Sequence, residues 1–144
     1  MSDVAAVLSV ETEPSPSDVR ALEIGLTEHA VPITGTRGFV PLAVFARARG
    51  QVLGGAYGTT SWGWLHIALV WVSAELRRQG MGRRILEAIE GAARERGCTN
   101  AHLDTFSFQA RPFYEKLGYE VFATLEDFPP GHRRFFLRKR LRGV

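Results

Sequence analysis

The spacing of hydrophobic and polar residues changes several times along the chain, and each change predicts a structural element. Residues 5–10 (AAVLSV) form a short apolar run that predicts a first strand. The turn-forming stretch ETEPSPSD then predicts a helix whose N-terminus is capped by Ser17 or Asp18. This helix is expected to end before Pro32, because a proline disfavours helical backbone in the residue before it.

The middle of the chain is rich in residues that favour strands. Residues 39–48 and 51–60 are separated only by the dipeptide Arg49-Gly50, which predicts a hairpin. Residues 62–72 (WGWLHIALVWV) are apolar nearly throughout and are interrupted only by His66. Such a run is typical of a strand in the centre of a sheet that is covered on both faces.

A helical spacing begins at Gly80 and ends at Gly97, which predicts an amphipathic helix with a glycine after its last turn. Its apolar side is Met81, Ile85, Leu86, Ile89, Ala92 and Ala93, and its polar side is Arg83, Glu87, Glu90 and Arg94. Residues 101–106 (AHLDTF) predict the next strand. A right-handed crossover through the helix would make this strand parallel to the one that ends near Val72.

The remaining chain predicts a short helix at about 108–117, with Pro112 near its first turn and Gly118 at its end. Further elements are expected to be a strand at 119–125, a loop at 126–132 and a closing strand at 133–141. Basic and apolar residues alternate in the closing strand, as they do in an edge strand. The order of elements predicts a single α/β (α+β) domain spanning residues 1–144.

Composition narrows the class of protein. The 144 residues are 45% hydrophobic and 23% charged, which is ordinary for a folded domain with one core. Cys98 is the single cysteine, which excludes intramolecular disulfides and Cys-rich zinc sites, and its apolar neighbours predict a buried structural thiol. The N-terminal apolar run is too short for a signal peptide, and no run reaches the ~18 residues of a membrane span. We therefore expect a cytoplasmic protein with no membrane partner and no metal.

Positive charge gathers in residues 76–85 (LRRQGMGRRI) and in the C-terminal segment, and the formal net charge is +3. The first segment lies at the start of the amphipathic helix, where backbone N–H groups lack partners and the helix dipole favours an anion. Gly80 and Gly82 leave these N–H groups accessible, and the surrounding arginines attract negative charge. A pyrophosphate fits this segment better than a single carboxylate does.

Three phosphate-binding patterns can be compared with this segment. The pattern G-x-x-x-x-G-K-[ST] is absent, which disfavours a nucleoside triphosphatase. A dinucleotide fingerprint would need a third glycine where the chain has Ile85. The pattern R/Q-x-x-G-x-G is present as residues 77–82 (RRQGMG).

This third pattern, together with the later QARPFYEKLGYEVF, resembles the two signatures of the GCN5-related N-acetyltransferase (GNAT) superfamily. The resemblance covers about Trp64 to Tyr119, and both motifs stand in the right order and at the right separation. It implies acetyl-CoA as the acetyl donor and direct attack of an amine on the thioester. It also implies a GNAT-like mixed, mostly antiparallel sheet flanked by helices, with a splayed central strand.

Site residues follow from the same resemblance. Tyr114 would protonate the leaving thiolate, and the backbone amides of the glycine-containing segment would hold the pyrophosphate. Ser107 stands where the family often has an asparagine that contacts the cofactor. The implied cofactor-binding positions are Leu69, Val70, Trp71, Val72, Arg77, Arg78, Gln79, Gly80, Met81, Gly82, Arg83, Ser107 and Phe113.

His66 has two interpretations. Many relatives place a glutamate on the central strand as the general base, and His66 occupies the corresponding position. A histidine titrates near neutral pH and could take the proton of the amine, or it could be a hydrogen-bonded core residue. Glu28, Glu126 and Asp127 are alternative proton acceptors. The aromatic residues Trp62, Trp64, Phe106, Phe108 and Phe128 could line an acceptor pocket or belong to the core.

The expected partner is a small-molecule amine, which no residue identifies further. A non-catalytic acyl-CoA-binding or sensing domain is the alternative, because His66 replaces a carboxylate. A nucleic-acid-binding module is disfavoured, since no stripe of interleaved basic and aromatic residues occurs outside the C-terminal segment. Pairing of the last strand with its mate could form a homodimer.

Overall fold

The computed structural model describes residues 4–35 and 38–141, and the chain divides into two compact units, residues 1–37 and 38–144. The first unit contains a single described helix, α1 (Pro16–Thr34). Every other described element, and every residue of the two motifs, belongs to the second unit. That residues 1–144 behave as one domain stays a prediction.

Helix α1 begins earlier and ends later than its sequence predicts. Its N-cap is Ser15 rather than Ser17 or Asp18, and the Ser15 hydroxyl accepts a hydrogen bond from the Asp18 N–H at 3.2 Å. The helix continues through Pro32 to Thr34, although the proline has no N–H to donate to the carbonyl four residues earlier. Gly35, with φ of 74°, ends it by donating its N–H to the Val31 carbonyl at 2.8 Å.

The predicted strand at residues 5–10 is wrong. These residues form no regular structure, and Val7, Leu8 and Val10 are each more than nine-tenths exposed. A strand is stabilised by pairing with a neighbour and by burial of one face, and this segment has neither in the structure.

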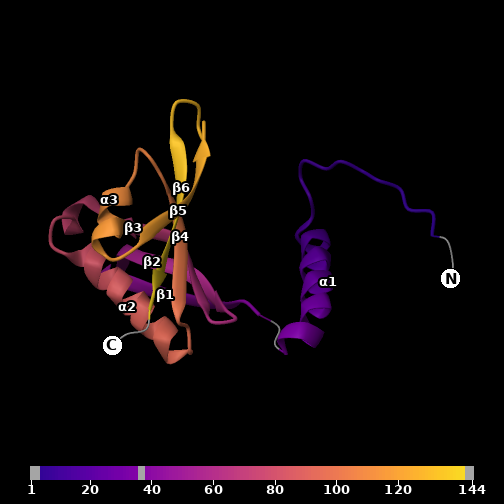
Figure 1. Cartoon of the computed structure of the whole chain (residues 1–144), viewed down its shortest axis with the longest axis horizontal. Coiled ribbons are helices and arrows are strands. Elements are labelled where there is room, and N and C mark those ends of the chain that lie inside the picture. The colour runs from indigo at the N-terminus through magenta and orange to yellow at the C-terminus, as the bar shows by residue number, and fades with distance from the viewer. Residues whose placement is uncertain (1–3, 36–37, 142–144) are drawn as a thin grey trace. The chain divides into compact units, whose positions relative to one another are not determined.

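The second unit is built on a six-stranded sheet in the order β1-β2-β3-β4-β6-β5 (Figure 1). The strands are β1 (Val40–Ala48), β2 (Gln51–Ser61), β3 (Trp64–Val72), β4 (Asn100–Phe106), β5 (Glu120–Glu126) and β6 (Arg133–Arg140). Only β3 and β4 are parallel, and the other neighbours are antiparallel. The predicted hairpin, the parallel crossover and the mixed, mostly antiparallel sheet are therefore confirmed.

Two helices cover one face of the sheet (Figure 1). Helix α2 (Met81–Glu95) follows a 3₁₀ turn, η1 (Ala74–Leu76), and packs Ile85, Leu86 and Ile89 into the core. Helix α3 (Arg111–Lys116) is shorter than the predicted 108–117, because residues 107–109 form a turn before it. Gly97 follows α2 with φ of 88°, as predicted for a helix end, and the predicted burial of the neighbouring Cys98 is confirmed.

The closing strand β6 is an interior strand and not the predicted edge strand. It pairs with β4 on one side and with β5 on the other, so β5 and β1 are the edges of the sheet. The alternation of basic and apolar residues arises because Phe135 and Leu137 enter the core, while Arg138 and Arg140 point to the opposite face. An interior strand has no free edge, so the predicted dimer cannot form through β6 in this way.

Strands β3 and β4 pair over only three residue pairs, which end at His66 and His102. Beyond them the strands separate. The β2–β3 register also shifts between Tyr57 and Gly58 and skips Ala68, so the side that faces the helices changes from Leu65 and Ile67 to Val70 and Val72. The opposite side chains of β3 are open, with Leu69 66% and Trp71 54% exposed, so the prediction that this strand is covered on both faces is wrong.

Within the described part of the chain, no helix is long and apolar enough to cross a membrane.

Candidate active site

The segment between β3 and α2 forms a tight loop whose shape depends on two residues with positive φ. Arg78 has φ of 64° and Gly80 has φ of 75°, and Gly80 is the N-cap of α2. The Arg77 guanidinium donates to the Val72 carbonyl at 3.0 Å, which ties the loop to the end of β3. The Gln79 amide donates to the Glu75 carbonyl at 2.9 Å. The loop is therefore held in place by its own side chains, with the first N–H groups of α2 directed outward from the helix end.

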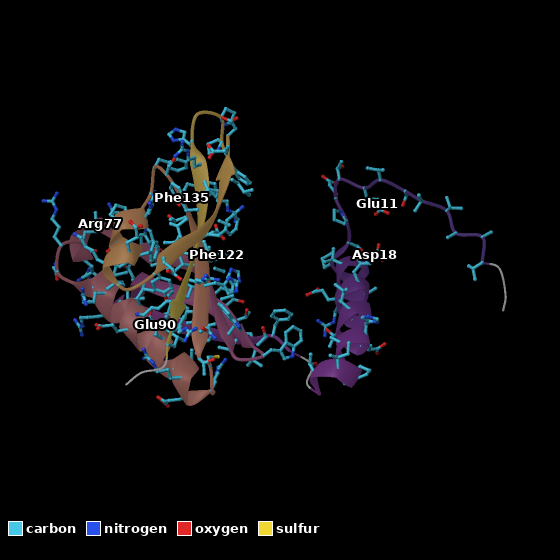
Figure 2. The ribbon with its side chains drawn as sticks, viewed as in Figure 1. Glu11, Asp18, Arg77, Glu90, Phe122 and Phe135 are labelled. Carbon is cyan, nitrogen blue, oxygen red and sulfur yellow. The ribbon has the colours of Figure 1, made fainter. Side chains whose placement is uncertain are left out.

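A groove of about 630 Å³ runs from the end of β3 across this loop to α3, and we call it the loop groove. Four basic residues and no acidic residue line it, which suits an anionic ligand. Its lining residues are Val70, Trp71, Val72, Leu76, Arg77, Arg78, Gly80, Met81, Gly82, Arg83, Ala110, Phe113, Tyr114, Lys116 and Leu117. Figure 2 labels Arg77 in the loop and Glu90 farther along α2.

The two glycines of the loop serve different geometric purposes. Gly80 needs its left-handed backbone, but a Cβ there would meet nothing within 4 Å. A Cβ on Gly82 would lie 3.1 Å from Cζ of Phe113, a tight contact with the ring on α3. Gly82 therefore allows α2 and α3 to approach closely beside the anion-binding N–H groups. Accessible amides, basic walls and this close approach fit the diphosphate end of coenzyme A.

A second cavity of about 280 Å³ lies where β3 and β4 separate, and we call it the strand cleft. Its lining residues are Ile67, Ala68, Leu69, Val70, Leu103, Asp104, Thr105, Phe106, Gln109, Ala110 and Tyr114. The loop groove and the strand cleft share Val70, Ala110 and Tyr114. A ligand in the groove and a ligand in the cleft would therefore meet beside Tyr114.

Tyr114 is buried at this junction, with 8% of its surface exposed. Its ring contacts Phe113 and Tyr119 edge to face, with centroids 5.1 and 6.1 Å away. Burial raises the pKa of the Tyr114 phenol, and the negative charge of Asp104 raises it further. The phenol thus keeps its proton at neutral pH, as a general acid must.

His66 lies on the face of β3 opposite to the one that Leu65 and Ile67 turn toward the helices. It stands at the point where β3 and β4 begin to separate. It stacks on His102 with ring centroids 4.6 Å apart and planes 11° from parallel, and Trp64 lies edge-on to His102. Burial and the neighbouring His66 lower the pKa of His102, while Asp104 opposes this effect. His66 is half-buried and lies outside the lining of both cavities, so both of its interpretations stay predictions.

Some predicted site residues do not reach the groove. Ser107 lies outside its lining, and its hydroxyl is engaged with Nδ1 of His132 at 3.2 Å and with the N–H of Arg133 at 3.0 Å. Leu69 lines the strand cleft instead, and Gln79 supports the loop from outside. The other ten predicted cofactor positions all line the loop groove.

The alternative proton acceptors are exposed. Glu28 belongs to the first unit. Glu126, on β5, pairs with Arg133 at 3.0 Å. Neither they nor Asp127 line the strand cleft. Phe106 does line it, but Trp62, Trp64, Phe108 and Phe128 do not. The acidic residue that the cleft does contain, Asp104, was not among the proton acceptors or substrate-binding residues expected from the sequence.

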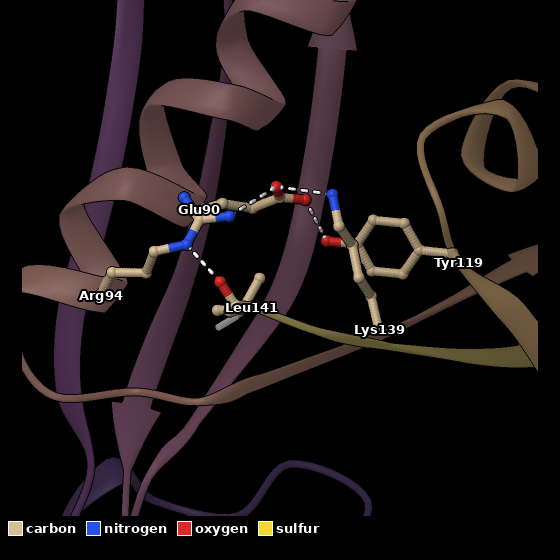
Figure 3. Close-up of polar contacts among 5 residues, drawn as sticks. All are labelled: Glu90, Arg94, Tyr119, Lys139 and Leu141. Atoms are coloured by element: carbon tan, nitrogen blue, oxygen red, sulfur yellow. Dashed lines mark hydrogen bonds and ion pairs between the residues drawn. The ribbon is translucent and has the colours of Figure 1, made fainter. Parts of the chain in front are cut away.

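Sequence reasoning also misplaced Glu90, which was expected on the polar side of α2. The residue is 2% exposed, and its carboxylate accepts from the Tyr119 hydroxyl at 2.7 Å and from the Lys139 ammonium at 2.8 Å (Figure 3). Arg94 lies 4.0 Å away in the same helix and donates to the Leu141 carbonyl. Burial and then the neighbouring Glu90 carboxylate raise the pKa of Tyr119 far above its usual range. This network joins α2, β6 and Tyr119, the residue that precedes β5.

Comparisons with known proteins agree with this geometry. The model of the acetyltransferase (GNAT) family matches residues 10–119. A blasticidin-S acetyltransferase from Streptomyces morookaense is 41% identical over 106 residues, which cover 70% of this chain and 78% of that protein.

Solved structures show the same arrangement. An acetyltransferase from Bacillus cereus is 31% identical and superposes with a TM-score of 0.78 over 92% of this chain and 97% of that one. An aminoglycoside 6'-N-acetyltransferase complexed with coenzyme A shares the fold, with a TM-score of 0.65, 16% identity and coverage of 96% and 99%.

Proposed function

Because the chain belongs to the acetyltransferase (GNAT) family, we propose that it moves the acetyl group of acetyl-CoA to a primary amine on a small molecule. The observation that carries this proposal is the meeting of the loop groove and the strand cleft at Tyr114. The donor and the acceptor would enter from different sides and meet beside one buried phenol.

The donor assignment is supported by the loop groove and by a relative. The groove combines helix N–H groups with Arg77, Arg78, Arg83 and Lys116, which suits the phosphates of coenzyme A. The aminoglycoside acetyltransferase of the same fold was solved with coenzyme A. The exposed backbone of β3 beyond His66, left without a β4 partner, would pair with the amide groups of the pantetheine arm.

The acceptor assignment is supported by the relative named for blasticidin S, an antibiotic. A primary amine is mostly protonated at neutral pH, so the site must first remove a proton. We assign this step to His66, directly or through water, because the residue is half-buried beside the opening of the strands.

The transfer then requires the amine nitrogen to lose protons and the leaving sulfur to gain one. The neutral amine forms a C–N bond to the thioester carbonyl carbon, and the C–S bond breaks as the carbonyl re-forms. The Tyr114 phenol donates its proton to the leaving sulfur. The attacking nitrogen loses its second proton as the amide forms, and this proton restores the phenol directly or through water, while His66 releases the first amine proton to solvent. The raised pKa of Tyr114 keeps the donor form available for this step.

The test is release of free thiol from acetyl-CoA by the full chain, with a panel of amines that includes blasticidin S. We expect saturable release that depends on the amine, together with an acetylated product detected by mass spectrometry. Binding of acetyl-CoA by calorimetry without release for any amine would instead support a non-catalytic acyl-CoA-binding domain. An absence of acetyl-CoA binding would contradict both.

A further inference from the structure

The strand cleft contains one charge among its described lining residues, and that charge is negative. Asp104 lies on β4, two residues beyond the last β3–β4 pair, and its side chain is 24% exposed. The rest of the lining is neutral and includes both apolar side chains, such as Leu69 and Phe106, and polar ones, such as Gln109 and Tyr114. A ligand that enters the cleft therefore meets a single carboxylate among neutral polar and apolar groups.

The carboxylate is held in position from one side. Nε and a terminal nitrogen of Arg134 both contact Oδ1 of Asp104, at 2.9 and 2.8 Å. Arg134 is itself held by three rings, with its guanidinium 5.4, 5.0 and 5.2 Å from the centroids of Phe106, Phe128 and Phe136. Because both contacts use Oδ1, they leave the lone pairs of Oδ2 available for a further donor.

Asp104 is also close to the residues of the proposed chemistry. Its charge acts on the phenol of Tyr114 and on the imidazole of His102, which stacks on His66. A cation bound at Asp104 would thus share the strand cleft with Tyr114, the proposed acid.

We propose that Asp104 binds the acceptor as an ammonium ion and selects for acceptors that carry a cationic amine. This inference rests on the proposed function, because it assigns the strand cleft to the amine. An ammonium ion donates three hydrogen bonds, and a partly buried carboxylate attracts it more strongly than an exposed one would. Asp104 orients the amine, and the proton leaves to a different group, His66, before the nitrogen attacks.

The experiment compares two probes of nearly equal shape that differ in charge. Benzylammonium carries the cation, and benzyl alcohol is neutral at the same pH. Calorimetry measures the binding of each to the full chain in the presence of coenzyme A, so the result does not depend on turnover. We expect the parent chain to bind benzylammonium at least about tenfold more tightly than benzyl alcohol, as for a charged hydrogen bond.

Variants then test whether Asp104 causes the preference for benzylammonium over benzyl alcohol. Asp104→Asn keeps the shape and is expected to bring the two affinities to within about twofold, whereas Asp104→Glu keeps most of the preference. Glu126→Gln is the matched control, because Glu126 is also paired with an arginine on β6 but lies outside the cleft. It should leave the preference unchanged.

Several results would overturn the proposal. Equal affinities of the parent for both probes would do so without any variant having to fold, as would a preference retained in Asp104→Asn or lost in Glu126→Gln. Failure of the proposed function is a separate result: the Asp104-dependent preference would persist while no amine in the panel is acetylated.

Discussion

Tyr114 is the residue on which the proposed chemistry depends most directly. Tyr114→Phe keeps the ring between Phe113 and Tyr119 and removes only the hydroxyl. We expect turnover to fall about 10²-fold, the lower end of general acid catalysis, because a thiolate is already a good leaving group. Acetyl-CoA affinity and melting temperature should hardly change. A folded variant with nearly parental turnover under conditions where chemistry is limiting would remove Tyr114 from the mechanism.

The pKa of Tyr114 also determines the highest pH at which this residue can act as an acid. Burial and Asp104 raise the pKa of Tyr114 above its ordinary value, so the protonated, acid form persists to higher pH than that of a free phenol. Turnover should therefore show no decline assignable to Tyr114 below about pH 10. The pH profile of the parent, compared with that of Tyr114→Phe, measures this limit.

His66 gives a different pH signature. If it takes the proton of the amine, His66→Gln should reduce the rate strongly at pH 7 and much less at pH 9, where more of the amine is already neutral. His132→Gln is a suitable control, because that histidine contacts Ser107 outside the strand cleft. Equal losses at both pH values would indicate that His66 has a structural role.

At the scale of elements, the approach of α2 to α3 can be tested at a single glycine. Gly82→Val would place a side chain against the Phe113 ring and in front of the N–H groups of α2. We expect acetyl-CoA affinity measured by calorimetry to fall at least tenfold, or ~1.4 kcal/mol. Gly91→Val is the control on the same helix, since a Cβ there meets nothing within 4 Å. Equal affinities of the two variants would contradict the phosphate-loop assignment.

The network around Glu90 joins elements rather than binding a ligand. Glu90→Ala leaves the Lys139 ammonium and the Tyr119 hydroxyl without their partner, and we expect the free energy of unfolding in urea to fall by about 3 kcal/mol. Glu87→Ala, exposed on the same helix, should change it by less than about 0.5 kcal/mol. Replacing both Glu90 and Lys139 by leucine should recover much of the loss, because no uncompensated charge remains.

This network also illustrates what the sequence could predict. The helix α2 and its loop were predictable, because their signals are local: a helical spacing and two glycines among arginines. The burial of Glu90 was not, because its partners Tyr119 and Lys139 are 29 and 49 residues away. The helical pattern shows only that Glu90 lies outside the apolar face of α2. In the fold, Lys139 of β6 and Tyr119, which precedes β5, cover its carboxylate.

The position of β6 and the role of Asp104 were missed for the same reason. Strand order is set by long-range pairing, so an alternation of basic and apolar residues could not distinguish an edge strand from an interior one. Asp104 became a candidate only when the separation of β3 from β4 placed it in a cavity with Tyr114. Tyr114 itself was identified through a local motif, whereas its proximity to a carboxylate needed the fold.

For the whole molecule, the distribution of charge predicts how the donor arrives. The chain carries a formal net charge of +3, and the loop groove has only basic residues among its charged lining side chains. Acetyl-CoA is an anion, so its association rate should fall as ionic strength rises. Stopped-flow measurements should show a smaller salt dependence for Arg83→Gln than for the parent. Arg138→Gln, which alters a strand residue outside the groove, should affect it less.

The short contact between β3 and β4 has a mechanical consequence. Strands β1, β2 and β3 form one extensively paired plate, and β4, β6 and β5 form another, while three residue pairs from Trp64 to His66 form the joint. Each plate is stiff because its strands pair along most of their length, so bending between them is concentrated at the joint. The width of the opening at Tyr114 is thus controlled from Trp64, His66 and His102, at the closed end of the gap. Substitution of Trp64, which lines neither the loop groove nor the strand cleft, would thus act on the reaction without touching either substrate.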